Sequence, residues 1–250
     1  MNDMVLTFLV GAIIGSFLNV CIYRLPRKES IVFPVSHCPN CQTPIPFYHN
    51  IPILSFLLLR GKCVSCQKPI HWRYPLVELI NAFGYIYIFS VFGMGWISAT
   101  YALLFSTLLV VTFIDLEHKI IPDSITLPGM GLGLLAASTV LPPGFIDSLI
   151  GLLLGGGFFY LIAVVSRGGM GGGDIKLIAM IGAFLGWQNV LMTIFVGALA
   201  GSVVGIFLMI FRGKGRKYAV PFGPFLALGA VVSLLWNQEI LNWYLLLLRS

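Results

Sequence analysis

Long apolar stretches separated by short polar connections run through most of this chain. A helix that crosses a membrane needs about 20 mainly apolar residues. By that rule the sequence predicts eight membrane-spanning helices, with seven or nine as the alternatives, because the sixth is short. They cover residues 4–23, 75–96, 98–114, 124–141, 145–165, 175–187, 189–211 and 221–236. The pattern therefore predicts an all-α, polytopic membrane protein.

The composition agrees with a lipid bilayer as the main surroundings of the chain. Of its 250 residues, 58% are hydrophobic and only 10% are charged, whereas a soluble domain has roughly 25% charged residues. The net charge of +6 does not require a nucleic-acid partner, because basic residues in a membrane protein report orientation. We therefore expect a membrane protein with no nucleic-acid partner.

The basic residues alternate between the two sides of the predicted bundle. They concentrate in the connection over residues 24–73 and in every second connection after it, and only Arg249 falls on the opposite side. The positive-inside rule then places these connections in the cytoplasm and the N-terminus outside. The residues concerned are Arg24, Arg27, Lys28, Arg60, Lys62, Lys68, Arg73, Lys119, Arg167, Lys176, Arg212, Lys214, Arg216 and Lys217.

One sizeable soluble segment, residues 24–74, follows the first span over residues 1–23 and precedes the helix bundle over residues 75–250. It holds two C-x2-C pairs, at the spacing of a zinc ribbon. Two disulfides or unrelated thiols are the alternatives, but a cytoplasmic loop is a reducing environment. Four thiolates leave no open position for a catalytic water, so we expect a structural zinc. The four ligands would be Cys38, Cys41, Cys63 and Cys66.

Four acidic residues lie near the predicted cytoplasmic ends of the spans. Asp115 directly follows the third span and Asp174 begins the sixth, so both are expected at the membrane boundary. Asp123 follows Pro122 at the start of the fourth span, where the expected role is a helix N-cap. Glu117 lies in the same connection and is expected to be a solvated charge.

Asp174 is distinguished by the glycine run that precedes it. Glycine allows positive φ and close approach of another chain, and ionisable groups in membrane segments are functional by default. An acid after such a run can also be a helix N-cap behind a flexible loop. Asp115 and Asp174 lie at one depth on helices of opposite direction, so they could meet across a bundle.

Such a pair of carboxylates has a known chemical use. Two carboxylates that lie close together share one proton, because both cannot easily ionise. The ionised group then takes a proton from water while the protonated group polarises a peptide carbonyl. We see no Ser/His/Asp arrangement and no H-E-x-x-H pattern in the sequence. The pair indicates peptide hydrolysis without a metal; the alternative is an isolated aspartate at each helix end.

The sequence resembles the type IV prepilin leader peptidases, a branch of the membrane aspartic proteases with a G-x-G-D motif. The resemblance runs from the first span to at least the sixth. It is carried by residues 15–26, by the short segments 37–41, 44–46, 50–52, 54–56 and 60–63, by residues 73–78, by Asp115 through Asp123, and by Gly171-Gly-Gly-Asp174-Ile-Lys176.

The resemblance implies that Asp115 and Asp174 are the catalytic pair, with Gly171 and Gly173 shaping the loop. It further implies cleavage of the short basic leader of prepilins or pseudopilins at the cytoplasmic face of the bacterial inner membrane. Family members with the cysteine-bearing loop also methylate the new N-terminal amine, with S-adenosylmethionine as methyl donor. This chain keeps that loop, so the resemblance implies both activities.

Two other classes of protein remain as alternatives. One is a zinc-ribbon membrane scaffold whose carboxylates are structural. The other is a transporter, for which Glu78 and Asn81 would line a path through the second span. The sequence shows no inverted repeat that would favour transport, and a pairing of Glu78 with a nearby basic residue of the loop would explain that acid.

Overall fold

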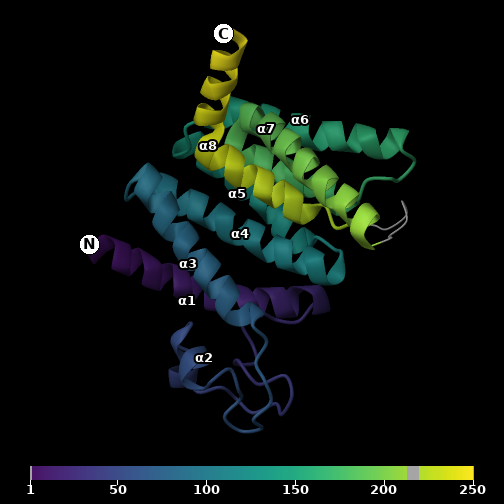
Figure 1. Cartoon of the computed structure of the whole chain (residues 1–250). Helices are drawn as coiled ribbons and strands as arrows, with labels where there is room; N and C mark the ends of the chain where they lie inside the picture. Colours follow the sequence, from purple (N-terminus) through teal and green to yellow (C-terminus); the bar gives the residue numbers. More distant parts are fainter. Residues whose placement is uncertain (1, 213–219, 250) are drawn as a thin grey trace. The chain divides into compact units, whose positions relative to one another are not determined.

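The computed structural model describes residues 2–212 and 220–249, and the regular elements among them are helices (Figure 1). The all-α prediction is therefore confirmed. The chain divides into two units, Met1–Val110 and Val111–Ser250. The elements are α1 (Asn2–Arg24), η1 (Leu25–Arg27), η2 (Phe47–His49), α2 (Leu54–Leu58), α3 (Arg73–Phe92), α4 (Trp96–His118), α5 (Asp123–Thr139), α6 (Gly144–Val165), α7 (Gly172–Arg212) and α8 (Gly223–Arg249).

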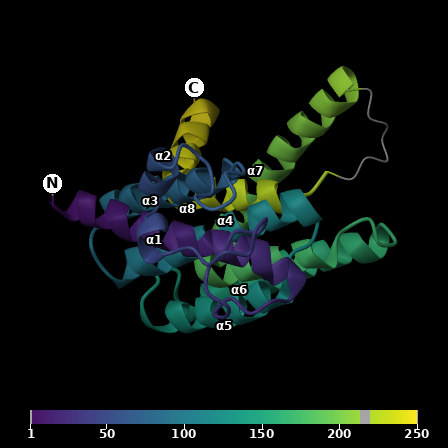
Figure 2. The same ribbon diagram turned by 90° about the horizontal axis from the view of Figure 1, so that it is seen from below.

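The first unit is built on the packing of α1 against α3 (Figures 1 and 2). Two glycines of α1 allow the close approach that small residues give to membrane helices. A Cβ on Gly11 would lie 2.8 Å from Ala82 Cα, and a Cβ on Gly15 would lie 2.7 Å from Glu78 Cα. A larger side chain at either position would push the two helices apart.

The second unit surrounds the first half of α7. This half packs against α5 and α6, and its side chains at Leu177, Ile178, Met180 and Ile181 are fully buried. The later part of α7 packs along α8, where a Cβ on Gly197 would lie 3.0 Å from the carbonyl oxygen of Phe225. The core of this unit therefore lies where the glycine run leads into the first half of α7.

The long element α7 turns back on itself at Gly186, whose φ of 76° and ψ of 173° interrupt the helix. A Cβ on Gly155 of α6 would lie 3.1 Å from the Ile178 carbonyl oxygen and also 3.1 Å from Val190 Cγ1. In a straight helix those two residues would be about 18 Å apart. The two halves of α7 therefore form a helical hairpin, and glycine supplies the positive φ at the turn.

Within the described part of the chain, six helices are long and apolar enough to cross a membrane: α1, α3, α4, α6, α7 and α8. The chain is therefore a polytopic membrane protein, as the sequence predicts. The remaining predicted span corresponds to α5, which has only 17 residues, and two predicted spans fall together in α7. The predicted basic residues Lys214, Arg216 and Lys217 lie outside the described residues.

Candidate active site and metal centre

Asp115 lies within the last turn of α4 and is 5% exposed. The helix continues past it to His118, one turn beyond the predicted end of the span. Its Oδ2 accepts a hydrogen bond of 2.9 Å from the main-chain N–H of Gly223, the first residue of α8. The first N–H groups of a helix have no partner inside the helix and favour negative charge nearby. The N-terminus of α8 therefore holds the Asp115 carboxylate in one position.

Asp174 lies in the first turn of α7 and is half-buried. It is the third residue of the helix, so it does not occupy the N-cap position. Its carboxylate bends back over the glycine run, and a Cβ on Gly171 would lie 2.8 Å from Asp174 Oδ2. The absence of a side chain at Gly171 therefore makes room for the carboxylate of Asp174.

The side chain of Ile121 links the surroundings of the two acids. A Cβ on Gly173, next to Asp174, would lie 2.8 Å from Ile121 Cβ. A Cβ on Gly223, which donates to Asp115, would lie 3.3 Å from Ile121 Cδ1 and 2.7 Å from Asp115 Oδ2. The carboxylates of Asp115 and Asp174 also interact electrostatically. The second unit thus brings together the two acids that the sequence selects.

The other two acids of this region have different partners. Asp123 is the first residue of α5, and the N-cap is Pro122, so the predicted capping role of Asp123 is wrong. Pro122 adopts the extended conformation of an N-cap, and its carbonyl oxygen accepts from Ile125 and Thr126. The Asp123 carboxylate instead accepts two hydrogen bonds of 2.7 Å from Lys176 Nζ.

Glu117 lies at the end of α4, and its side chain is 37% exposed. Its carboxylate is 4.0 Å from His118 Nε2. This exposed position agrees with the expected solvated charge. Asp115 and Asp174, and not Glu117, are the acids near Ile121.

Sequence reasoning missed Gly223 and Ile121. Gly223 begins the last helix within Pro221-Phe-Gly-Pro-Phe225, a pattern that signals a helix start but not its distant partner. The bond to Asp115 joins residues 108 positions apart, which no local periodicity indicates. Ile121 is one apolar residue in a connection, and only the fold shows that it contacts two glycines.

The four cysteines of the C-x2-C pairs form one cluster in the first unit. Their sulfur atoms all lie within 4.8 Å of one another. The distance from sulfur to sulfur is 3.9 Å between Cys38 and Cys66 and 4.0 Å between Cys41 and Cys63. Four thiolates at about 2.3 Å from a tetrahedral zinc lie about 3.8 Å apart. The cluster therefore fits a metal ion, and the cysteines within the described chain form no disulfide.

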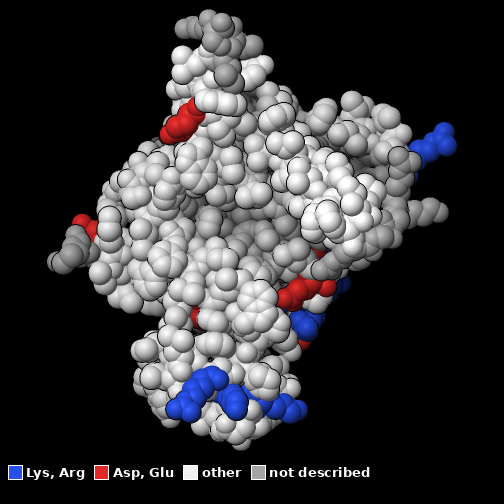
Figure 3. Space-filling view, in the orientation of Figure 1, with Lys and Arg blue, Asp and Glu red and all other residues white. Residues whose placement is uncertain are grey.

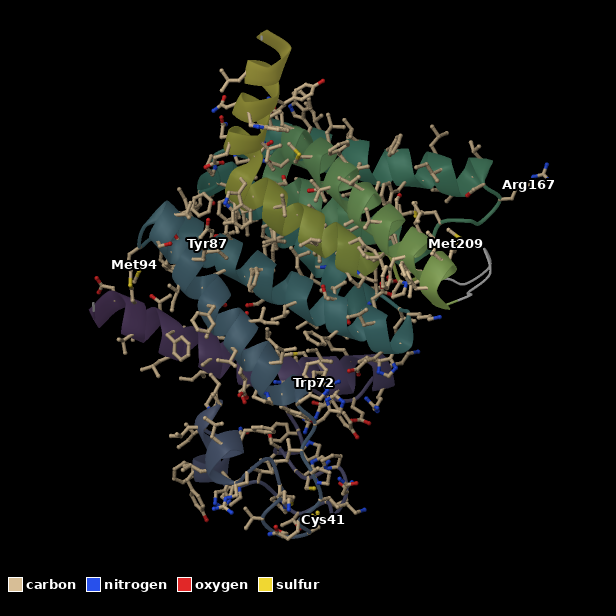
Figure 4. All side chains as sticks on the ribbon, in the orientation of Figure 1. Cys41, Trp72, Tyr87, Met94, Arg167 and Met209 are labelled. Atoms are coloured by element: carbon tan, nitrogen blue, oxygen red, sulfur yellow. The ribbon has the colours of Figure 1, made fainter. Side chains whose placement is uncertain are left out.

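Two similar turns build this cluster. In the first turn the Cys38 N–H donates to the Thr43 carbonyl and Gln42 takes a φ of 58°. In the second turn the Cys63 N–H donates to the Lys68 carbonyl and Gln67 takes a φ of 56°. In Figure 4, Cys41 lies at the far end of the loop from Trp72, where α3 begins.

Local hydrogen bonds favour the thiolate at one cysteine of each turn. Bonds from the hydroxyl and main-chain N–H of Thr43 lower the pKa of Cys41 to about 6, and the Thr43 hydroxyl oxygen lies 3.3 Å from the Cys41 sulfur. Main-chain bonds from Cys66 and Ser65 lower the pKa of Cys63. At Cys66 a main-chain bond from Lys68 lowers the pKa, but desolvation and hydrogen bonds with the other three thiols raise it to about 11. Thiolate is the form that binds metal.

The polar groups of α3 are engaged inside the first unit. Asn81 is fully buried; its Nδ2 donates to the Gly11 carbonyl over 2.8 Å, and its Oδ1 accepts from Ser106 Oγ over 2.8 Å. The Glu78 carboxylate accepts from the main-chain N–H of Ile53 over 2.7 Å. These groups tie elements together and do not line a path for a solute.

The fold and site define a class: a polytopic helical membrane protein with paired acids at helix ends and a four-cysteine loop. Comparison with known families is more specific. Residues 102–206 match the type IV leader peptidase family, and residues 9–92 match the bacterial peptidase A24 N-terminal domain. The chain belongs to the type IV leader peptidase family.

Several relatives are similar over nearly the whole chain, and each is named prepilin leader peptidase/N-methyltransferase. The protein of Aeromonas hydrophila is 37% identical over 269 residues, which cover 96% of this chain and 93% of the relative. That of Pseudomonas aeruginosa is 37% identical, covering 96% and 92%. That of Neisseria gonorrhoeae is 36% identical, covering 96% and 94%. No solved structure matches the chain.

Proposed function

We propose that Asp115 and Asp174 are the catalytic pair of a membrane aspartic peptidase that removes the leader from prepilins or pseudopilins. The observation that carries this proposal is the pairing itself. A buried carboxylate held by the N-terminus of α8 and a carboxylate folded over Gly171 both flank Ile121 and interact electrostatically. The family and the names of the relatives supply the substrate class.

The pair hydrolyses a peptide bond through proton transfers. The ionised carboxylate takes a proton from water, and the resulting hydroxide attacks the carbonyl carbon. The protonated carboxylate gives its proton to the carbonyl oxygen, which becomes a hydroxyl in the tetrahedral intermediate. The first carboxylate then passes the proton that it took from water to the amide nitrogen, the second recovers a proton from the hydroxyl of the intermediate, and the carbon–nitrogen bond breaks. The products are the leader's carboxylate and the free amine of the mature pilin.

A cleavage assay tests the pair. The protein in lipid nanodiscs is mixed with a prepilin that has a short basic leader, and loss of the leader is followed by mass. Asp115→Asn and Asp174→Asn should each lower the rate on the order of 10³-fold. The double variant should be no slower than either single variant, because the two groups act as a unit.

Asp123→Asn is the matched control, since it lies in the same region but binds Lys176. It should keep most of the activity. An inactive Asp123→Asn variant beside an active Asp115→Asn variant would show that the wrong partner of Asp174 had been chosen.

The second activity of the relatives, N-methyltransfer, belongs to the same proposal. The chain retains the cysteine-bearing loop over its family-matched N-terminal part. S-adenosylmethionine is then a second substrate: its methyl group moves to the new N-terminal amine, which loses a proton. In the assay above, the mature pilin should gain the mass of one CH2 unit when this donor is present, because a methyl group replaces a hydrogen of the amine.

We further infer that the cysteine cluster holds a structural zinc. The distances of 3.9 and 4.0 Å between sulfur atoms suit tetrahedral zinc, and the lowered pKa values of Cys41 and Cys63 suit thiolate ligands. Four cysteine ligands leave zinc no free position. The metal would therefore stabilise the loop over residues 24–74 and take no part in bond breaking.

Eight membrane crossings are the topology that we propose, with the N-terminus outside and the acids at the cytoplasmic face of the inner membrane. Two observations support the count: the hairpin at Gly186 divides α7 into two crossings, and α5 supplies another short one. The peptidase then occupies residues 75–250. Reporter fusions after Arg27 and within residues 140–144 should report opposite sides of the membrane.

A further inference from the structure

The loop of the first unit carries an apolar surface centred on the short helix α2. Its side chains are strongly exposed: Phe47 is 86% exposed and Leu58 is 72% exposed. Exposed apolar surfaces of this kind mark contacts with another apolar partner. We call this surface the α2 patch, and it consists of Phe47, Tyr48, Leu54, Leu57 and Leu58.

The residue before α2 is hydrogen-bonded to a residue that lies within the membrane-spanning helix α3. The Ile53 N–H donates to Glu78 Oε2 over 2.7 Å, and Glu78 lies about 7 Å along α3 from its first residue. Glu78 Cα packs against Gly15, which lies about 13 Å from the end of α1 that carries the loop. Figure 1 shows α2 beside the α1–α3 pair. The α2 patch therefore begins at membrane depth.

The sequence around α2 lacks charge. Residues 31–59 contain no Lys, Arg, Asp or Glu, and basic residues resume at Arg60 and Lys62. Figure 3 shows basic side chains gathered along the lower end of this loop. Charged side chains are costly in hydrocarbon, so the lack of charge through α2 suits contact with lipid, although the same stretch also includes the first cysteine turn.

In an apolar environment backbone N–H and C=O groups need partners within the protein. The main chain around α2 has such partners. The N–H groups of Ser55 and Leu57 donate to carbonyl oxygens of the same segment, and the Ile51 N–H donates to Ser55 Oγ. Ile53 has a φ of 62°, which is strained for a β-branched residue, and its N–H reaches Glu78. Pro44, Pro46 and Pro52 have no N–H to satisfy.

We propose that α2 is a re-entrant membrane element whose patch contacts the acyl chains of lipids at the bilayer interface. Ile13 and Phe17 of α1, on either side of Gly15 in the sequence, are exposed apolar residues as well. Arg60 and Lys62, directly after α2, then face lipid phosphates. The loop is thus anchored in lipid at α2, while its cysteine cluster lies outside the bilayer. This assignment is independent of the proposed catalytic pair.

Photocross-linking in nanodiscs of phosphatidylethanolamine and phosphatidylglycerol tests the proposal. A leucine analogue with a diazirine replaces Leu57 or Leu58 in the full chain, with one chain in each disc. The carbene formed by light inserts into whichever molecule touches it, so mass spectrometry separates lipid adducts from addition of water. We expect lipid adducts at both positions to exceed water addition by about tenfold.

Val64 is the matched control, because it is an exposed apolar residue of the same loop within the cysteine cluster. There the analogue should add water and give few lipid adducts. Water addition at Leu57 and Leu58 at the level of Val64 would overturn the proposal. So would cross-linking of Leu57 to an added prepilin in preference to lipid, since the patch would then be a docking surface for substrate.

Discussion

The main-chain N–H of Gly223 donates to Oδ2 of Asp115 over 2.9 Å and joins two residues 108 positions apart. The glycine is needed for space as well as for its N–H, because a Cβ there would lie 2.7 Å from the same oxygen. A change at Gly223 therefore acts directly on the position of the Asp115 carboxylate.

Gly223→Ala should lower the rate of leader cleavage on the order of 100-fold, which is the effect of displacing a catalytic group by about 1 Å. Gly131→Ala is the matched control, since a Cβ at Gly131 in α5 meets nothing within 4 Å. Cleavage rates in nanodiscs check the prediction. Equal rates for the two variants would contradict it.

The glycine run before Asp174 gives a second prediction, because its three members differ in their surroundings. Gly171→Ala would displace the Asp174 carboxylate, and Gly173→Ala would collide with Ile121. Gly172→Ala meets nothing within 4 Å. We expect the two outer substitutions to reduce cleavage by about 100-fold and the middle one to leave it within a factor of about two. A similar loss in all three variants would point to backbone flexibility as the cause.

The cysteine cluster predicts about one zinc ion per chain in protein purified without added metal. Cys63→Ser should lower the zinc content and make residues 24–74 more sensitive to protease, because the metal crosslinks two turns. Cys21→Ala is the control, since Cys21 is buried in α1 and separate from the cluster. Metal analysis with limited proteolysis measures both effects. Zinc-free protein with four freely alkylated thiols in the cluster would refute the assignment.

The two proposed activities should be separable. Methyl transfer needs a bound donor and a deprotonated amine in line with it, and neither requires two aspartates. Asp115→Asn and Asp174→Asn should therefore still methylate a pilin that is supplied already cleaved, and Cys63→Ser should impair methylation at least as much as cleavage. Incorporation of labelled methyl groups measures this. Loss of incorporation in a well-folded Asp174→Asn variant would show that the two sites overlap.

Much of this molecule can be predicted from the sequence because membrane helices and metal ligands have local signatures. Apolar runs locate the helices, and the C-x2-C spacing identifies the cysteine cluster. The boundary between the predicted spans 175–187 and 189–211 anticipates the break in α7, but the sequence does not single out Gly186 as the turn residue, because glycine is common in helices that pack closely. The role of Asp123 was predicted wrongly because a local N-cap signal competes with a distant cation, Lys176. Gly223 could not be assigned, since its partner is known only once the helices are packed.

The attachment of Asp115 to α8 has a consequence for the order of synthesis. Ribosomes make the chain from its N-terminus, so both aspartates enter the membrane before the helix that begins at Gly223. A nascent chain that lacks α8 holds its two acids without the amide that fixes one of them. If Asp115 belongs to the catalytic pair as proposed, we expect leader cleavage to require insertion of the last helix.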